Sequence, residues 1–405
     1  MRLDLLEEHV DEACFLFGQR QNALRSLVLT QGYLEGVDER LAAHLDALVV
    51  AGEAGWDHCR PLLDGLDAEA GFVSAMVALH GDEARAREVE RALSEADSLR
   101  PGPAWALCLA EGEAVDALSR RLLDSPNTPA RAAGLQALCF RRCDPGPALE
   151  GALAAEAPEL RRAALEGVRC LRARPHTSRV EALASSPDGA CREAALDALL
   201  VLEPQLARRI AIAELQAGGP AGPAAARVLG LAGQESDVTI LASAARAQEP
   251  VLARAALLAL GSLGYAAAVP VLLAALEDAP TARRSGCALL RLLGPGAVWE
   301  PAAGAVGPEE TPPEVDDDLP LWSAPPLRAW WEAHRAGFRG GERHRAGAVF
   351  RAGPPRAASG IALRHDEAVE EAIAAPEQPL RETRAWAAPP AIGTPSLPVG
   401  GRGRA

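Results

Sequence analysis

The stretch Val251–Gly264, VLARAALLALGSLG, decides the fold together with Ala268–Pro280, AVPVLLAALEDAP, which follows it closely. Alanine and leucine recur in both stretches at the spacing of one helix face. Gly264 stands where a helix end favours a left-handed residue, as do Gly233 and Gly294 in other repeats. Pro270, like Pro204, stands in the first turn of the next helix, where its missing N–H costs little. The two stretches therefore predict a pair of short helices.

The first helix of this pair recurs along the chain. Its arginine is found at five positions, separated by 31, 30, 62 and 30 residues: Arg131, Arg162, Arg192, Arg254 and Arg284. A degenerate unit, Gly222–Leu231, fills the double step. One helix pair cannot cover its own apolar face, so neighbouring pairs must stack. The period predicts an all-α chain folded as an α-α solenoid.

The repeats resemble short HEAT-like repeats of the phycobilin-lyase type, in which an Arg-Ala-Ala-x-x-Ala-Leu-x-x-Leu-Gly helix precedes an Ala-Val-Pro-x-Leu helix. The resemblance covers residues 125–295 well and continues weakly upstream. The recurring arginines are either a ligand-binding ladder or structural residues that reach carbonyls or carboxylates of the next repeat. The sequence leaves both interpretations open.

Composition predicts six segments. They are a helical N-terminal cap (1–60), degenerate repeats (61–124), the repeat solenoid (125–300), an acidic Pro-rich linker (301–326), a C-terminal helical segment with a Trp-Trp element (327–386) and a disordered tail (387–405). Within them we predict second helices at Gln205–Leu215, Asp237–Ala247 and Ala268–Glu277, and a late helix at His365–Ala375.

Charge and hydropathy exclude several functional classes. The net charge of −14 argues against a nucleic-acid-binding surface, which needs a basic footprint. The sequence has no lysine, which excludes Schiff-base chemistry and a phosphate-binding lysine. No uncharged run approaches the ~18 residues of a membrane span, and the first residues lack an apolar signal core. We therefore predict a cytoplasmic protein whose eight cysteines are reduced.

Motifs for catalysis or metal binding are absent from the sequence. Cys139 and Cys143 share a helix face and could hold half a zinc site, but no second Cys/His pair follows. HEAT-like di-iron hydroxylases rely on His-Glu pairs, and no histidine here is followed by glutamate. Phosphate-binding, nucleophile-elbow and dinucleotide motifs are missing too. The sequence predicts no enzyme activity, no metal and no cofactor.

The two ends of the chain carry a second resemblance. The matching positions are His9, Glu12, Ala13, Phe15, Leu16, Arg20, Gly55-Trp56, Leu319-Pro320, Trp330-Trp331, Arg335, Phe338 and Gly341–Arg343. This pattern resembles an uncharacterised family of bacterial HEAT-repeat proteins that tend to occur with type VI secretion components. The chain departs from it at His344-Arg345, where the family usually has an aromatic and an aliphatic residue. The resemblance implies an accessory or scaffolding role near that machine.

The remaining candidates are protein-binding residues, because aromatic and arginine side chains are enriched at interface hot spots. They are Trp56, Trp330, Trp331, Arg335 and Phe338. The alternative is that the C-terminal aromatics dock their own segment on the last repeat. We predict a non-enzymatic protein–protein interaction scaffold, with type VI secretion components as candidate partners. The competing hypothesis is a bilin lyase-like enzyme or chaperone that binds a small molecule. Partner identity, binding face and oligomeric state stay open.

Overall fold

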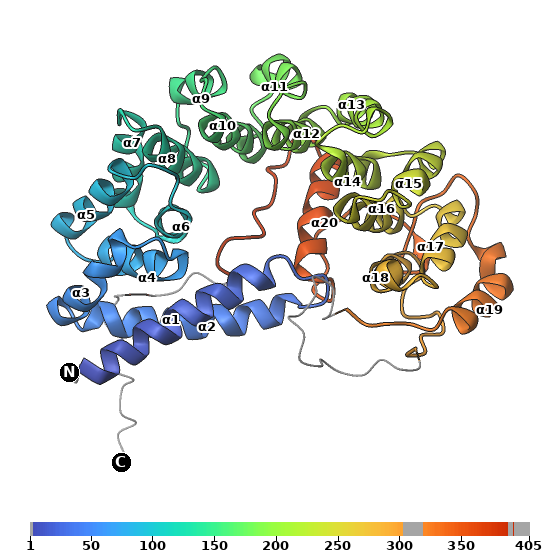
Figure 1. Cartoon of the computed structure of the whole chain (residues 1–405), viewed down its shortest axis with the longest axis horizontal. Helices are drawn as coiled ribbons and strands as arrows, with labels where there is room; N and C mark the ends of the chain where they lie inside the picture. The colour runs from blue at the N-terminus through green and yellow to red at the C-terminus, as the bar shows by residue number, and fades with distance from the viewer. Residues whose placement is uncertain (1–2, 303–318, 388–391, 393–405) are drawn as a thin grey trace, which may run out of the picture. The chain divides into compact units, whose positions relative to one another are not determined.

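The computed structural model describes residues 3–302, 319–387 and 392 (Figure 1). Within these ranges the chain forms 20 α-helices, five 3-10 helices and a two-stranded hairpin. The all-α prediction is confirmed, and successive helices pack in pairs as in an α-α solenoid of short repeats. No helix in the described part is both long and apolar enough to cross a membrane.

The chain divides into two compact units, each of which packs mainly against itself. Unit 1 comprises Met1–Arg25, Thr30–Ala148 and Arg384–Ala405, and unit 2 comprises Ser26–Leu29 and Leu149–Thr383. The predicted cap and the predicted degenerate repeats therefore belong to one unit, together with the last part of the chain.

Unit 1 consists of short helices in sequence order. They are α1 (Leu3–Ala23), α2 (Gln31–Val50), α3 (Glu53–Cys59), η1 (Arg60–Asp64), α4 (Ala68–Leu79), α5 (Glu83–Ser94), α6 (Pro101–Leu109), α7 (Glu113–Leu123) and α8 (Thr128–Phe140). Helix α9 (Pro147–Leu153) contains the boundary to unit 2. Asp67, Asp82 and Asn127 each accept a backbone N–H at the start of a helix, which explains why α4, α5 and α8 begin where they do.

The core of unit 1 lies between its successive helices. Helix α4 packs against α1 and α6, and α6 packs against α8. Phe17 of α1 stacks on Phe72 of α4 with ring centroids 3.7 Å apart. The first two helices thus cover the apolar end of the repeat stack, which is the role expected of a cap.

Unit 2 continues the same pattern. Its elements are α10 (Pro158–Leu171), η2 (Arg174–His176), α11 (Thr177–Leu183), α12 (Gly189–Leu202), α13 (Pro204–Ala217), α14 (Gly222–Ala232), η3 (Glu235–Asp237), α15 (Val238–Ala244), α16 (Pro250–Leu263), η4 (Ala266–Ala268), α17 (Val269–Ala275), α18 (Ala279–Leu293), α19 (Ala324–His334), η5 (Arg335–Gly337), β1 (His344–Arg345), β2 (Ala348–Val349) and α20 (Ile361–Ala374).

The first helices of the repeats in unit 2 form one row. Helices α10, α12, α14, α16 and α18 each pack against the next. A Cβ on Gly230 would lie 2.9 Å from the Cα of Ala259, and one on Gly261 would lie 2.6 Å from the Cα of Ala288. These glycines lie 31 residues apart, one repeat from the other, and each lets its helix approach the next one closely: α14 approaches α16, and α16 approaches α18.

Most of the predicted helix ends agree with the structure. Pro204 and Pro270 lie in the first turn of α13 and α17. Gly264 and Gly294 have φ of 75° and 74°. Gly233 was expected to be left-handed, but its φ is −78°. Glycine is needed there because a Cβ would meet the carbonyl oxygen of Leu229 at 2.2 Å.

The chain after α18 differs in part from its predicted organisation. The linker predicted at 301–326 falls mostly outside the described residues, but Leu319 is buried and α19 already begins at Ala324. The helix predicted at His365–Ala375 is α20. The disordered tail predicted at 387–405 also lies outside the described residues, except for Ala387 and Ile392, and Ile392 joins the core of unit 1.

Candidate functional site

Two of the predicted protein-binding residues are buried. Trp56, in α3, is 6 % exposed and belongs to the core of unit 1. Trp331, in α19, is also 6 % exposed. Both side chains therefore pack inside the protein and present no open surface to a partner.

The other three predicted residues gather at the end of α19 in unit 2. Trp330 is half-buried and stacks on His334 with ring centroids 4.4 Å apart. Phe338 meets the Trp330 ring edge-on at 6.3 Å. Arg335 is exposed and pairs with Glu332 at 3.3 Å. Phe338 is half-buried like Trp330, so Trp330, Phe338 and above all exposed Arg335 are the members that a partner could touch.

A second site lies in unit 1; of its residues, the sequence pointed only to Arg20, as a position shared with the type VI-associated pattern. The site holds the irregular segment Arg384–Ala387 mainly through its backbone. Nη2 of Arg20 donates to two successive carbonyl oxygens of the segment, 2.8 and 2.9 Å away. Oδ2 of Asp38 accepts the backbone N–H of Ala387 at 2.9 Å. These bonds depend on the main chain of the segment and not on its side chains.

Helices α1 and α2 place this pair in the interior. Nε of Arg20 donates to Oδ1 of Asp38 at 2.8 Å, and the two side chains are 0 % and 3 % exposed. Burial raises the pKa of Asp38, and the charge of Arg20 opposes that rise. The guanidinium also lies over the ring of Trp386, 5.3 Å from its centroid. A buried, oriented ion pair therefore forms the floor on which the segment rests.

Two side chains of the segment are recognised in addition. The indole N–H of Trp386 donates to the carbonyl oxygen of Leu109 at 2.9 Å, at the end of α6. The guanidinium of Arg384 lies over Trp105 and Phe140, 6.0 and 5.6 Å from their ring centroids. We call Arg20, Asp38, Trp105, Leu109 and Phe140 the segment-binding site. Its chemistry is that of recognition: main-chain hydrogen bonds, one indole donor and one cation on aromatic faces.

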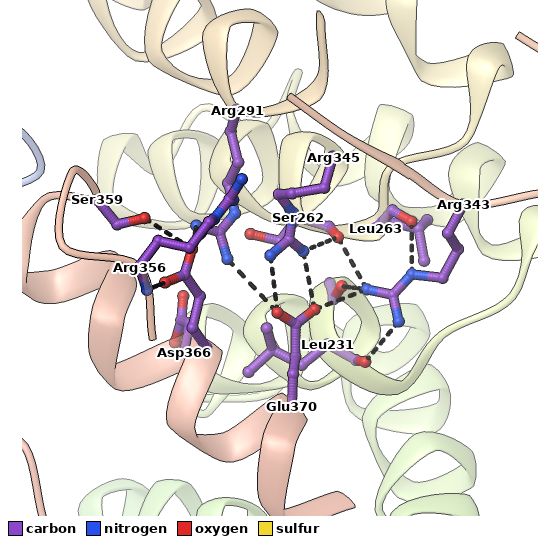
Figure 2. Close-up of polar contacts among 12 residues, drawn as sticks. Leu231, Ser262, Leu263, Arg291, Arg343, Arg345, Arg356, Ser359, Asp366 and Glu370 are labelled. Atoms are coloured by element: carbon purple, nitrogen blue, oxygen red, sulfur yellow. Dashed lines mark hydrogen bonds and ion pairs between the residues drawn. The ribbon is translucent and has the colours of Figure 1, made fainter. Parts of the chain in front are cut away.

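Unit 2 contains a buried charge cluster around Glu370 of α20. Figure 2 shows Glu370 between Arg343, Arg345 and Arg291. Its carboxylate accepts hydrogen bonds from Arg343 and Arg345 at 2.8 Å and lies 3.8 Å from Arg291. Burial alone would raise the pKa of Glu370, but the hydrogen bonds and charges of the arginines hold it below its usual value. Burial and the charge of Arg345 lower the pKa of Arg291 to about 10.

Arg343 and the backbone after it cover the ends of three helices. Arg343 donates to the carbonyl oxygens of Leu231, Ser262 and Leu263, at the ends of α14 and α16 (Figure 2). The N–H of Ala346 donates to the carbonyl oxygen of Arg291 in α18. The last carbonyls of a helix lack intrahelical partners and carry partial negative charge. The segment 343–347 therefore satisfies them across three repeats.

Further ion pairs fix α20 on the repeats. Nε of Arg227, in α14, donates to Asp366 at 2.8 Å. Glu367 accepts from Arg356 and, at 2.8 Å, from the hydroxyl of Ser359. A hollow of about 260 Å³ lies beside these groups, lined by Arg345, Ala348, Val349, Phe350, Arg351, Gly353, Pro354, Arg356, Glu367 and Glu370. Because its charged walls are largely paired, we assign this cluster to anchoring the C-terminal helix.

The recurring arginines do not form one uniform ladder. Arg192 pairs with Glu214 in the second helix of its own repeat, and Arg131 donates to Thr128 in its own helix. A cross-repeat contact comes instead from Arg172, whose Nη2 donates to the carbonyl oxygen of Val201 at 3.0 Å. The contacts of Arg131 and Arg192 are structural.

Among the residues that the structure describes, no three histidine, cysteine, aspartate or glutamate side chains are grouped so as to hold a metal ion.

Comparisons with known proteins add little to this geometry. No protein-family model matches the chain. A search of curated proteins also gives no match. Among solved structures, an engineered protein from the Northeast Structural Genomics Consortium is similar at 15 % identity, with 69 % of this chain and 88 % of that chain covered and a TM-score of 0.32. The resemblance to type VI-associated proteins therefore stays a prediction.

Proposed function

We propose that this protein is a non-enzymatic interaction scaffold that holds segments of partner proteins. The observation that carries the proposal is the segment-binding site of unit 1, in which buried Arg20 and Asp38 bind the backbone of residues 384–387. Recognition through main-chain hydrogen bonds, with a few side chains read in addition, is a common way to bind a peptide.

The partners that we propose to test first are type VI secretion components, because the terminal sequence motifs resemble a family that occurs with them. An exposed surface in unit 2, Trp330 and Arg335 on and beside α19, has residue types that are frequent at hot spots. Either surface could contact such a component.

A direct binding experiment with purified proteins tests the proposal. Each candidate component is titrated into the full chain by calorimetry, at low and at moderate salt. The double variant Trp330→Ala/Arg335→Ala and the variant Trp105→Ala map the two surfaces. The matched control is Leu66→Ala, because Leu66 is 94 % exposed and lies outside both surfaces.

The expected result is saturable binding that one mapping variant weakens at least about tenfold and the control leaves unchanged, a loss of about 1.4 kcal/mol. Absence of binding to every component at every salt concentration would contradict the secretion role. The alternative of a bilin lyase-like protein is tested separately by titration with a bilin. A spectral shift at stoichiometric bilin would favour it over the scaffold.

A further inference from the structure

We propose that residues 384–387 are an exchangeable occupant, and that the segment-binding site accepts a partner-protein segment with the pattern Arg-x-Trp. This inference rests on the proposed function and names the class of partner. The chain's own segment would then be an internal mimic that a partner must displace.

The site is built for an occupant. Arg20 and Asp38 are 0 % and 3 % exposed. In addition to their mutual contact, Nη2 of Arg20 donates to the segment and Oδ2 of Asp38 accepts from it. A buried charged group without a partner is costly. In an empty site Arg20 and Asp38 would keep their mutual ion pair, but Nη2 of Arg20 and Oδ2 of Asp38 would have only water as partners, so the site favours an occupant that offers main-chain carbonyl and N–H groups.

The site binds some segments better than others. The bonds from Arg20 and Asp38 read only backbone atoms, and they would hold many sequences equally well. Selectivity therefore comes from two positions. The cation of Arg384 lies on the rings of Trp105 and Phe140, and the indole of Trp386 reaches the carbonyl oxygen of Leu109. A carboxylate at the first position would lose the attraction to the ring faces.

The segment 384–387 can exchange because it is the less buried part of its surroundings. It has no helix or strand of its own, and residues 384–387 are only half-buried, whereas the floor beneath them is buried. The nine residues 375–383 connect it to the end of α20, so its release breaks no helix. Leu380 and Ile392, buried on either side, mark the limits of the part that exchanges. A short tether gives the internal segment an effective concentration in the millimolar range. A partner segment must therefore bind the site more tightly, or be present at a higher concentration, than it would need to if the site were empty.

The test uses the full chain with its internal segment disabled. In the double variant Arg384→Ala/Trp386→Ala the site loses its side-chain contacts but keeps every residue that forms it. The probe is a fluorescein-labelled peptide of residues 381–388, Arg-Glu-Thr-Arg-Ala-Trp-Ala-Ala. The matched control peptide has alanine in place of its second arginine and its tryptophan. Binding is followed by fluorescence anisotropy.

We expect saturable binding of the probe to the double variant and binding at least about tenfold weaker to the wild type, because the tethered segment competes. The control peptide should not bind, and Trp105→Ala added to the double variant should weaken the probe. Equal affinity for wild type and double variant, equal binding of both peptides, or no binding to a variant with an unchanged circular dichroism spectrum would each overturn the inference.

Two further measurements complete the test. If the double variant is poorly folded, the single variant Trp386→Ala replaces it, and a rise of its melting temperature with added probe is the expected result; no rise overturns the inference. Dimers of the wild type that form with concentration and dissolve on adding the probe would assign the site to a second copy, against a partner protein. Failure here leaves the scaffold function testable, because calorimetry with secretion components detects binding at any surface.

Discussion

Arg20 and Asp38 form a fully buried ion pair, with 2.8 Å between Nε and Oδ1, and both residues also hold the backbone of residues 384–387. One contact thus joins the first two helices to the end of the chain within unit 1. The position of this pair explains why unit 1 contains residues that lie more than 300 positions apart in the sequence. It also makes the pair a sensitive place for substitutions.

Arg20→Ala should destabilise unit 1 by about 3–5 kcal/mol, because it leaves the buried carboxylate of Asp38 without its cation. Chemical denaturation followed by circular dichroism measures the loss. Arg40→Ala is the control, since that side chain is 60 % exposed and lies 3.8 Å from Glu12, and its effect should stay within about 0.5 kcal/mol. Similar losses for the two variants would contradict the role given to the buried pair.

Binding of the segment peptide should weaken as the pH falls. Burial, opposed by the charge of Arg20, raises the pKa of Asp38 above 3.8, so the carboxylate that accepts the segment's N–H is neutralised at a less acidic pH than an exposed one. Because the pKa of Asp38 is raised in the folded chain, the folded chain binds a proton at Asp38 more readily than the unfolded chain does. Protonation of Asp38 therefore favours the folded state as the pH falls. The probe should therefore dissociate before unit 1 unfolds.

Anisotropy and circular dichroism recorded between pH 7 and pH 4 check this order of events. When Asp38→Asn is added to the double variant Arg384→Ala/Trp386→Ala, the protein should bind the probe with little dependence on pH. A pH profile that is the same with aspartate and with asparagine would rule out Asp38 as the group responsible.

Glu370→Gln should destabilise unit 2 by about 3–5 kcal/mol, because buried Arg345 and half-buried Arg343 lose their shared carboxylate. The folded pKa of Glu370 is lowered, so its contribution is present above the unfolded value near 4.5 and is lost as the pH falls through the folded value. Urea unfolding at pH 7 measures the effect. Glu377→Gln, at an exposed position, is the control, and an equal loss there would count against the cluster.

Gly261→Ala should destabilise the repeat stack by about 2 kcal/mol, because the new methyl group would overlap the backbone of Ala288. Gly151→Ala is the matched control, since its Cβ meets nothing within 4 Å, and it should stabilise α9 by about 0.5–1 kcal/mol. Melting temperatures of the two variants should move in opposite directions. A neutral Gly261→Ala would mean that α16 and α18 are less tightly packed than described.

The repeat itself could be predicted from sequence because it obeys local rules. The period near thirty, the prolines at Pro204 and Pro270 and the glycines at Gly264 and Gly294 each act within one helix pair. Gly233 was misjudged because its glycine is required by a close carbonyl and not by a left-handed backbone. Such a contact has no signature in composition or spacing.

The candidate sites were harder to predict because they join distant parts of the chain. Trp56 and Trp331 have the residue type of a hot spot, but burial depends on packing that the sequence does not specify. Arg345 was noted as a departure from a family pattern, and the structure shows it binding Glu370. Two sequence signals belong to the segment-binding site: Arg20, which matches a family pattern, and the Arg-x-Trp of residues 384–386 in a Pro- and Ala-rich end.

The most direct test of that site is hydrogen exchange at the backbone N–H of Ala387 in the wild type, which bonds to Asp38. We predict that this N–H exchanges at least about tenfold more slowly than in Asp38→Asn, and that its exchange accelerates when the 381–388 peptide is added in excess. Exchange of this N–H at the rate of an unstructured peptide in the wild type, unchanged by the peptide, would contradict it.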